Sequence, residues 1–169
     1  MSHRLLILRH AKSDWNASFA SDIDRPLSQR GVAAAGRIGR FVAAEGVVPD
    51  VVMSSPAVRA RTTTEFAIEA GGWERELRIH DEFYGGGGAA VLGTLQGLSA
   101  ETGSAIIVGH QPIWSSLVGS LTGGSQVRFP TAALACLGFE GPWSDLDWGA
   151  AELLWLVTPK LLGRAVVDR

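Results

Sequence analysis

Three apolar runs of this sequence each lead into basic side chains that could bind or transfer an anionic group. In chain order, these runs and the side chains after them are residues 5–8 with Arg9 and His10, residues 50–53 with Arg59, and residues 105–108 with His110. Short apolar runs bounded by turn residues are typical of buried strands. Ligands of open α/β sheets bind outside the carboxyl ends of the strands. We therefore expect these four side chains to meet in one anion site.

The residue types at this expected site fit phosphate chemistry. Arginine holds a phosphate well, because its planar guanidinium makes two parallel charge-assisted hydrogen bonds, and Arg9 and Arg59 are the candidates. Nearby cations lower the pKa of a histidine and keep it neutral, as a nucleophile must be. A neutral imidazole can attack phosphorus, while a second one stabilises the charge on the transferred oxygens. His10 and His110 are the histidines available for these two roles.

Each of these features has an ordinary structural explanation when it is taken alone. Arg9 and His10 could mark a solvated strand end, His110 could mark another, and Arg59 with Arg61 could form a solvated helix face. Their shared position at the carboxyl ends of predicted parallel strands favours a common site. Asp22 and Asp24 are interpreted as a solvated loop, because no His or Cys lies at ligand spacing from them. No metal site is predicted.

Composition and charge limit the remaining functions. The 169 residues are 46% hydrophobic and 19% charged, which predicts one globular domain over residues 1–169. The net charge of −2 gives no reason to expect nucleic acid or an anionic membrane as a partner. The single cysteine, Cys136, excludes an intrachain disulfide and is expected to be buried. The apolar run near the start is too short to span a membrane, so a cytoplasmic location is expected.

The elements that must position the site alternate between strand and helix patterns, which predicts an α/β fold. A helix is expected from Ser28, the N-cap, to about Gly46. The helix that carries Arg59 is expected to have Ser55 as its N-cap and Pro56 at its first position. Two late strands are expected at the edge of the sheet or antiparallel to it, at residues 133–139 and 152–157. The buried face of the Arg59 helix is expected to include Thr62, Phe66 and Ala70.

The same residues resemble a known family. The run Arg9-His10-Ala11-Lys12-Ser13, continued by Asp14-Trp15-Asn16, resembles the Arg-His-Gly/Ala signature of the histidine phosphatase superfamily. Residues 54–62 (SSPAVRART) and 108–112 (VGHQP) resemble its second and third motifs. Residues 24–28 (DRPLS) and 129–133 (FPTAA), with the short length, are most similar to the phosphohistidine phosphatase SixA branch. The likeness extends over essentially the whole chain.

This resemblance implies a fold and a set of roles. The implied fold is a three-layer α/β/α sandwich around a mostly parallel sheet with an antiparallel edge. His10 is implied to be the phosphorylated nucleophile, and Arg9, Arg59 and His110 are implied to complete the phosphate pocket. Further contacts to the substrate are expected from Ser13, Asn16 and Gln111. No metal and no organic cofactor is implied.

The substrate depends on whether a general acid is present. Larger members of the superfamily use a carboxylate to protonate a leaving alcohol, and Asp81 and Glu82 are the local candidates. The usual Glu-Arg-His-Tyr-like string is absent, which favours phosphohistidine in a protein partner over an alkyl phosphate, because imidazole leaves with less help. The alternatives are a phosphatase or mutase for a small phosphorylated metabolite and a non-catalytic phosphate-binding module.

Overall fold

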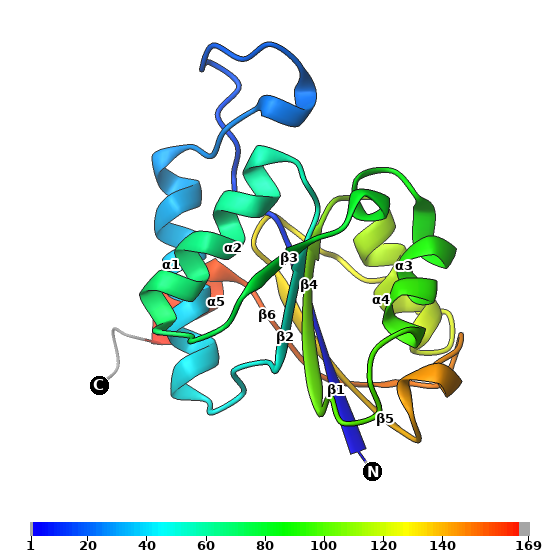
Figure 1. The fold of residues 1–169 in the computed structure, drawn as a ribbon. Coiled ribbons are helices and arrows are strands. Elements are labelled where there is room, and N and C mark those ends of the chain that lie inside the picture. The colour runs from blue at the N-terminus through cyan, green and yellow to red at the C-terminus, as the bar shows by residue number, and fades with distance from the viewer. Residues whose placement is uncertain (1, 166–169) are drawn as a thin grey trace.

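The computed structural model describes residues 2–165, which form a central sheet with helices on both sides (Figure 1). The strands of this part of the chain are β1 (Ser2–Arg9), β2 (Val51–Ser54), β3 (Leu77–Ile79), β4 (Ser104–Gly109), β5 (Leu134–Glu140) and β6 (Glu152–Val157). The α-helices are α1 (Gln29–Ala44), α2 (Val58–Gly71), α3 (Gly87–Gln96), α4 (Ile113–Leu121) and α5 (Pro159–Ala165). Short 3₁₀ turns lie at Asp22–Asp24 (η1), Asp81–Tyr84 (η2) and Trp143–Asp145 (η3).

The sheet places the predicted site strands beside one another. Its order is β3-β2-β4-β1-β5-β6, and the first four strands are parallel. Strand β5 runs antiparallel to β1, and β6 runs antiparallel to β5, as the two late runs predicted. In this register Arg9 lies opposite Gly109, and Ser54 lies opposite Val108. The carboxyl ends of β1, β4 and β2 therefore share one edge of the sheet, which confirms the predicted α/β class.

Alternating residues of the strands form the two cores. Leu5 and Ile7 of β1 pack with α3 and α4, whereas Leu6 and Leu8 pack with α1 and α2. Successive side chains of a strand point to opposite faces, so an apolar run of this kind is buried on both sides. Figure 1 shows α1, α2 and α5 on one side of the sheet and α3 and α4 on the other, which confirms the expected three layers.

Helix α1 begins as predicted and is fixed to the loop after β1. The Ser28 hydroxyl accepts a hydrogen bond from Gly31 N–H and donates one to the Lys12 carbonyl at 3.0 Å. A Cβ at Gly31 would lie 2.1 Å from that same carbonyl oxygen, so only glycine fits there. The first turn of α1 thus holds the backbone two residues after His10.

Helix α2 begins later than the sequence predicts. It starts at Val58 with Ala57 as its N-cap, so Pro56 lies before the helix. Ser55 is not the cap of this helix. Its hydroxyl instead accepts the N–H of Ala57 and lies 2.8 Å from Nε2 of His110. The hydroxyl that the local pattern assigned to capping therefore links the residues before α2 to a side chain 55 residues away.

The buried face of α2 also differs from the prediction. Thr62, Phe66 and Ala70 are only half-buried. The buried residues of this helix are Arg59, Ala60, Thr63, Thr64 and Ala67. This face packs closely on α1, where a Cβ added at Gly39 would lie 2.1 Å from the Ala67 carbonyl oxygen.

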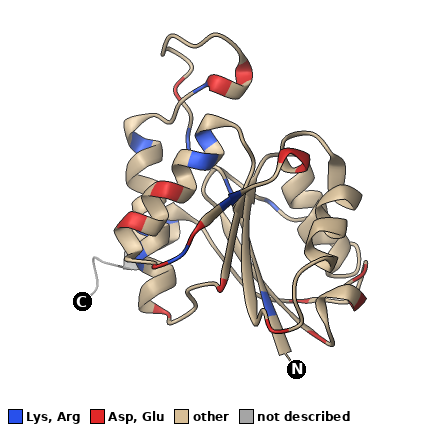
Figure 2. Cartoon of the chain, viewed as in Figure 1, with Lys and Arg blue, Asp and Glu red and all other residues tan. Residues whose placement is uncertain are grey.

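Charge is unevenly distributed over the layers. Figure 2 shows Arg along α1 and both Arg and Glu along α2, whereas the ribbons of α3 and α4 carry no charged residue. Cys136 is buried in β5, as predicted. His3, which its sequence context gave no reason to bury, is buried and stacks on Phe139 at a ring distance of 5.3 Å. No helix within residues 2–165 is both long and apolar enough to cross a membrane.

Candidate active site

The carboxyl ends of β1, β2 and β4 surround a cavity of about 230 Å3, which we call the strand-end pocket. It contains all four residues that the sequence placed at one anion site, together with Ser13 and Gln111. Its lining residues are Arg9, His10, Lys12, Ser13, Trp15, Arg25, Arg59, His110, Gln111 and Thr131. A water molecule takes up about 30 Å3 in the liquid, so the cavity can hold a group the size of several waters.

Arg9, the last residue of β1, is held by the loop that precedes β5. Its Nη1 donates to the Phe129 carbonyl at 2.9 Å, and burial lowers the pKa of its guanidinium. The N–H of Ala132 lies 3.1 Å from the carbonyl oxygens of both Arg9 and His10. Ala132 has a φ of 56°, which is uncommon for a residue with a side chain. The Ala132 N–H therefore fixes the end of β1 from a residue whose backbone is strained.

His10 is held as a neutral imidazole with one free nitrogen. Its Nδ1 lies 2.7 Å from the Ala11 carbonyl oxygen, which can only accept, so Nδ1 carries the proton. The lone pair is therefore on Nε2. Burial lowers the pKa of His10 to about 3, with smaller contributions from His110, Arg59 and Arg9. Burial, rather than the cations that the sequence suggested, is the largest cause of this neutral state.

His110 follows β4, and its ring centroid lies 5.1 Å from that of His10. Burial, followed by the charge of Arg59, lowers its pKa to about 4. The Ser55 hydroxyl lies 2.8 Å from Nε2 and already accepts the Ala57 N–H. We assign the hydroxyl proton to the bond with Nε2, which puts the His110 proton on Nδ1. With this assignment His110 carries an N–H that has no acceptor among the described residues, on a ring that lies beside the ring of His10.

Arg59 is buried at the start of α2 and is bound to the loop that follows β1. Its Nη1 donates to the backbone carbonyl of Asp22 at 2.6 Å, and its Nη2 donates to the Asp22 carboxylate at 2.9 Å. The same carboxylate accepts hydrogen bonds from Arg25 at 2.9 Å and from the Tyr84 hydroxyl at 3.1 Å. Partial burial opposes ionisation of Asp22, but the hydrogen bond from Arg25 and the attraction of Arg59 lower its pKa to about 2.

Asp22 and Arg25 belong to the candidate site, but their sequence pattern did not indicate this. Asp22 had been interpreted as part of a solvated loop, and it proves to be an ion-pair partner of both Arg25 and Arg59. The Arg25 guanidinium also donates to Ser13 Oγ and lies 3.7 Å from the ring centroid of Trp15. The one available signal in the sequence was the pair of opposite charges at Asp22 and Arg25, three residues apart and directly before Pro26. No local pattern indicates that Asp22 also pairs with Arg59 on α2.

Three of the predicted side chains lie outside the lining of the strand-end pocket. Asn16 is exposed, and its backbone N–H donates to the Asp14 carboxylate. Asp81 is exposed in η2. The Glu82 carboxylate accepts the Thr94 hydroxyl at 2.5 Å and contacts His80, and the Thr94 bond is the main cause of its lowered pKa. Glu82 is therefore ionised and already bound on η2 and α3.

The charges of the strand-end pocket suit an anion that is a phosphate or resembles one. Four cations line it, and within residues 2–165 no Asp or Glu side chain does. Buried N–H groups without an acceptor, at Arg9 Nε, Arg59 Nε and His110 Nδ1, add to the positive potential because their partial charges are uncompensated. The described residues contain no group of three or more His, Cys, Asp and Glu side chains arranged to hold a metal ion.

A family model and a related protein both match the sequence of this chain. A model of the histidine phosphatase superfamily (branch 1) matches residues 5–84. An uncharacterized protein of Mycobacterium tuberculosis is 31% identical over 163 residues, a match that covers 90% of this chain and 100% of that protein.

Two solved structures share the fold over nearly the whole chain. The protein histidine phosphatase SixA complexed with tungstate superimposes with a TM-score of 0.83 at 25% identity, covering 94% of this chain and 99% of that one. A candidate phosphohistidine phosphatase SixA from Nakamurella multipartitia has a TM-score of 0.82 at 29% identity, covering 94% and 97%.

Proposed function

This chain belongs to the histidine phosphatase superfamily, and we propose that it is a phosphohistidine phosphatase whose nucleophile is His10. Membership of the superfamily supports phosphatase or mutase activity. The finer proposal is that the substrate is phosphohistidine in a protein partner. The likeness to a SixA structure complexed with tungstate, a tetrahedral oxyanion, supports an oxyanion as a ligand of this chain.

One observation carries the role of His10: its Nδ1 is occupied by the Ala11 carbonyl at 2.7 Å, within a pocket lined by four cations. The ring is neutral, because its pKa is about 3, and its free lone pair is on Nε2. This is the state that a nucleophile needs. As Nε2 bonds to phosphorus, the ring gains positive charge, and the Ala11 carbonyl is placed to stabilise the Nδ1 proton.

The reaction then has two displacements. In the first, Nε2 of His10 attacks phosphorus, the P–N bond of the substrate breaks, and the leaving imidazole takes a proton from water. In the second, water attacks the phosphorylated His10, the new P–N bond breaks, and inorganic phosphate leaves. Arg9 and Arg59 hold the transferred oxygens in both steps, and His110 donates to the charge that develops on them.

The composition of the pocket favours phosphohistidine over an alkyl phosphate. An alcohol leaving group needs a general acid. Among the described residues no carboxylate lines the strand-end pocket, and Asp81 and Glu82 lie outside it. Asp22 lies nearest in the hydrogen-bond network, but its pKa of about 2 leaves it without a proton to donate at neutral pH. An imidazole leaving group needs less help.

The test compares a phosphohistidine peptide with para-nitrophenyl phosphate, both in the presence of a chelator. Wild type is expected to prefer the peptide, and His10→Ala is expected to abolish turnover of both. Arg59→Ala is expected to lower kcat by about 10²-fold or more, as removal of a transition-state donor does. Quenching with alkaline detergent during turnover, which preserves the acid-labile P–N bond, should trap a phosphorylated protein in wild type and none in His10→Ala.

Other outcomes would select the alternatives. Good turnover of only the ester would indicate a metabolite phosphatase or mutase, and a large loss of turnover of an alkyl phosphate in Asp81→Asn or Glu82→Gln would identify the general acid. Phosphate binding without turnover of either substrate would indicate a binding module. A rate that falls when the chelator is added would contradict a mechanism that depends on side chains alone.

A further inference from the structure

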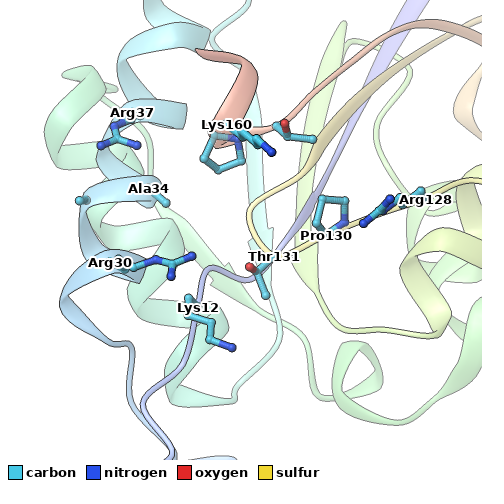
Figure 3. A pocket seen from close by; sticks show the side chains of 11 residues that line it. Lys12, Arg30, Ala34, Arg37, Arg128, Pro130, Thr131 and Lys160 are labelled. Carbon is cyan, nitrogen blue, oxygen red and sulfur yellow. The ribbon is translucent and has the colours of Figure 1, made fainter. Parts of the chain in front are cut away.

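A second and larger cavity lies next to the strand-end pocket. Its volume is about 630 Å3, and it is bounded by α1, the start of α5, the loop before β5 and the loop after β1. We call it the basic groove, and its lining residues are Lys12, Arg30, Ala33, Ala34, Arg37, Arg128, Pro130, Thr131, Thr158, Pro159 and Lys160. Figure 3 shows Arg30 and Arg37 extending from α1 on one side of the groove, with Arg128 across from them.

The basic groove concentrates positive charge in a chain that is slightly acidic. Five cations line it and, within residues 2–165, no Asp or Glu does, although the whole chain has a net charge of −2. Among the ion pairs of the described residues, none involves these five side chains. Unpaired like charges that converge on a cavity create a potential that attracts an acidic ligand.

The basic groove and the strand-end pocket meet. Lys12 and Thr131 line both cavities. Lys12 is two residues after His10, and Thr131 lies in the loop that fixes the end of β1. A ligand in the groove therefore lies beside the group that reacts in the pocket, and one substrate can occupy both.

The cations of the two cavities differ in a way that identifies the ligand. Arg25 and Arg59 are buried and held by hydrogen bonds to protein acceptors, which suits one small anion in one orientation. The groove cations are exposed, and the described structure gives their side chains no hydrogen bond. Long, exposed cations beside apolar Ala and Pro side chains suit carboxylates that are spread over a protein surface.

We propose that the basic groove binds acidic side chains of the protein substrate that lie beside its phosphohistidine. This inference rests on the proposed function and narrows it from phosphohistidine in general to phosphohistidine in an acidic surface. Exposed charges at an interface mainly raise the association rate and are screened by salt. The groove should therefore affect kcat/KM for the macromolecular substrate and leave the chemistry of a small one unchanged.

The experiment uses two phosphohistidine peptides of equal length, with either Glu or Gln next to the phosphohistidine, and phosphoramidate as the small substrate. Wild type is expected to have a kcat/KM about tenfold higher for the Glu peptide at low salt, and this preference should shrink in 0.5 M salt. The variant Arg30→Gln/Arg37→Gln/Lys160→Gln should lose the preference and retain turnover of phosphoramidate. A matched variant, Arg40→Gln/Arg61→Gln/Arg78→Gln, removes the same charge away from the groove and should keep the preference.

The results that overturn the proposal are distinct. Equal kcat/KM for the two peptides in wild type, or an unchanged preference in the groove variant, would overturn the inference and leave the proposed function standing. Turnover of phosphoramidate with neither peptide accepted would overturn both. A wild-type preference for pyrophosphate over the Glu peptide would assign the groove to a second phosphate of a small molecule and reject the protein ligand.

Discussion

The carboxylate of Asp22 ties two arginines of the strand-end pocket to one another. It accepts hydrogen bonds from Arg25 and Arg59, and the Tyr84 hydroxyl also donates to it. Because its pKa is about 2, Asp22 is an anion at neutral pH. Nη2 of Arg59 donates to this carboxylate, whereas Nη1 donates to the Asp22 backbone carbonyl, so a phosphate that binds at Nη2 competes with a resident carboxylate.

We expect Asp22→Asn to tighten inhibition by inorganic phosphate about fivefold. Removing a half-exposed charge several ångströms from a bound anion is worth about 1 kcal/mol, which is roughly that factor. The value of kcat is expected to fall at the same time, because Arg25 and Arg59 lose their shared anchor. Both quantities can be measured with para-nitrophenyl phosphate as the substrate.

The matched control for this change is Asp24→Asn. It removes the same charge from the same loop, but the Asp24 carboxylate accepts a hydrogen bond from the Ser21 hydroxyl and none from an arginine. This control should leave phosphate inhibition nearly unchanged. Equal tightening in the two variants, or weaker inhibition in Asp22→Asn, would show that Asp22 does not compete with phosphate for Arg59.

At the scale of elements, the spacing of α1 and α2 is set by a glycine. A Cβ at Gly39 would lie 2.1 Å from the carbonyl oxygen of Ala67, and Trp73 Nε1 also donates to the Gly39 carbonyl. The Ala67 carbonyl is part of the backbone of α2, so it cannot move away from a Cβ at Gly39 unless α2 itself shifts. Because α2 carries Arg59 into the site, this contact between helices also helps to position the pocket.

Gly39→Ala is therefore expected to destabilise the fold by roughly 1–3 kcal/mol, the usual cost of overpacking. Gly36→Ala is the control on the same helix, because its Cβ would meet Ala70 and Arg40 side-chain atoms at 3.4 Å, which is ordinary contact. Alanine favours helix over glycine by up to about 1 kcal/mol, so Gly36→Ala should be neutral or stabilising. Urea unfolding measures both changes. Equal losses in the two variants would mean that Gly39 does not set the spacing.

The sequence predicts an element well where local signals determine it. The apolar runs end within one residue of the observed strand ends at Arg9 and Gly109, and the N-cap is at Ser28 as predicted, because residues within a few positions determine these features. The N-cap at Ser55 was wrong, because the Ser55 hydroxyl bonds to Ala57 before the helix and to His110, which lies 55 residues away. The interpretation of Asp22 was wrong for the same physical reason, since its partner Arg59 lies 37 residues away.

At the scale of the whole molecule, the neutral histidines of the site link its stability to pH. The pKa of His10 is about 3 and that of His110 is about 4, whereas an unfolded chain has ordinary values near 6.5. Below about pH 6.5 the unfolded state therefore binds protons that the folded state excludes. By linkage, the free energy of unfolding falls as the pH is lowered from about 6.5 toward about 4.

We expect the free energy of unfolding, measured by urea titration, to fall between pH 7 and pH 5 by up to about 1.4 kcal/mol per pH unit for each histidine. The pKa of Asp22 is also lowered, but its effect on stability begins below about pH 4 and stays outside this range. His10→Gln/His110→Gln should flatten the dependence. His80→Gln, whose ring contacts Glu82 outside the strand-end pocket, should keep it. An equal decline in the double variant would show that the two site histidines are not kept neutral by burial, and the free lone pair assigned to His10 would lose its physical basis.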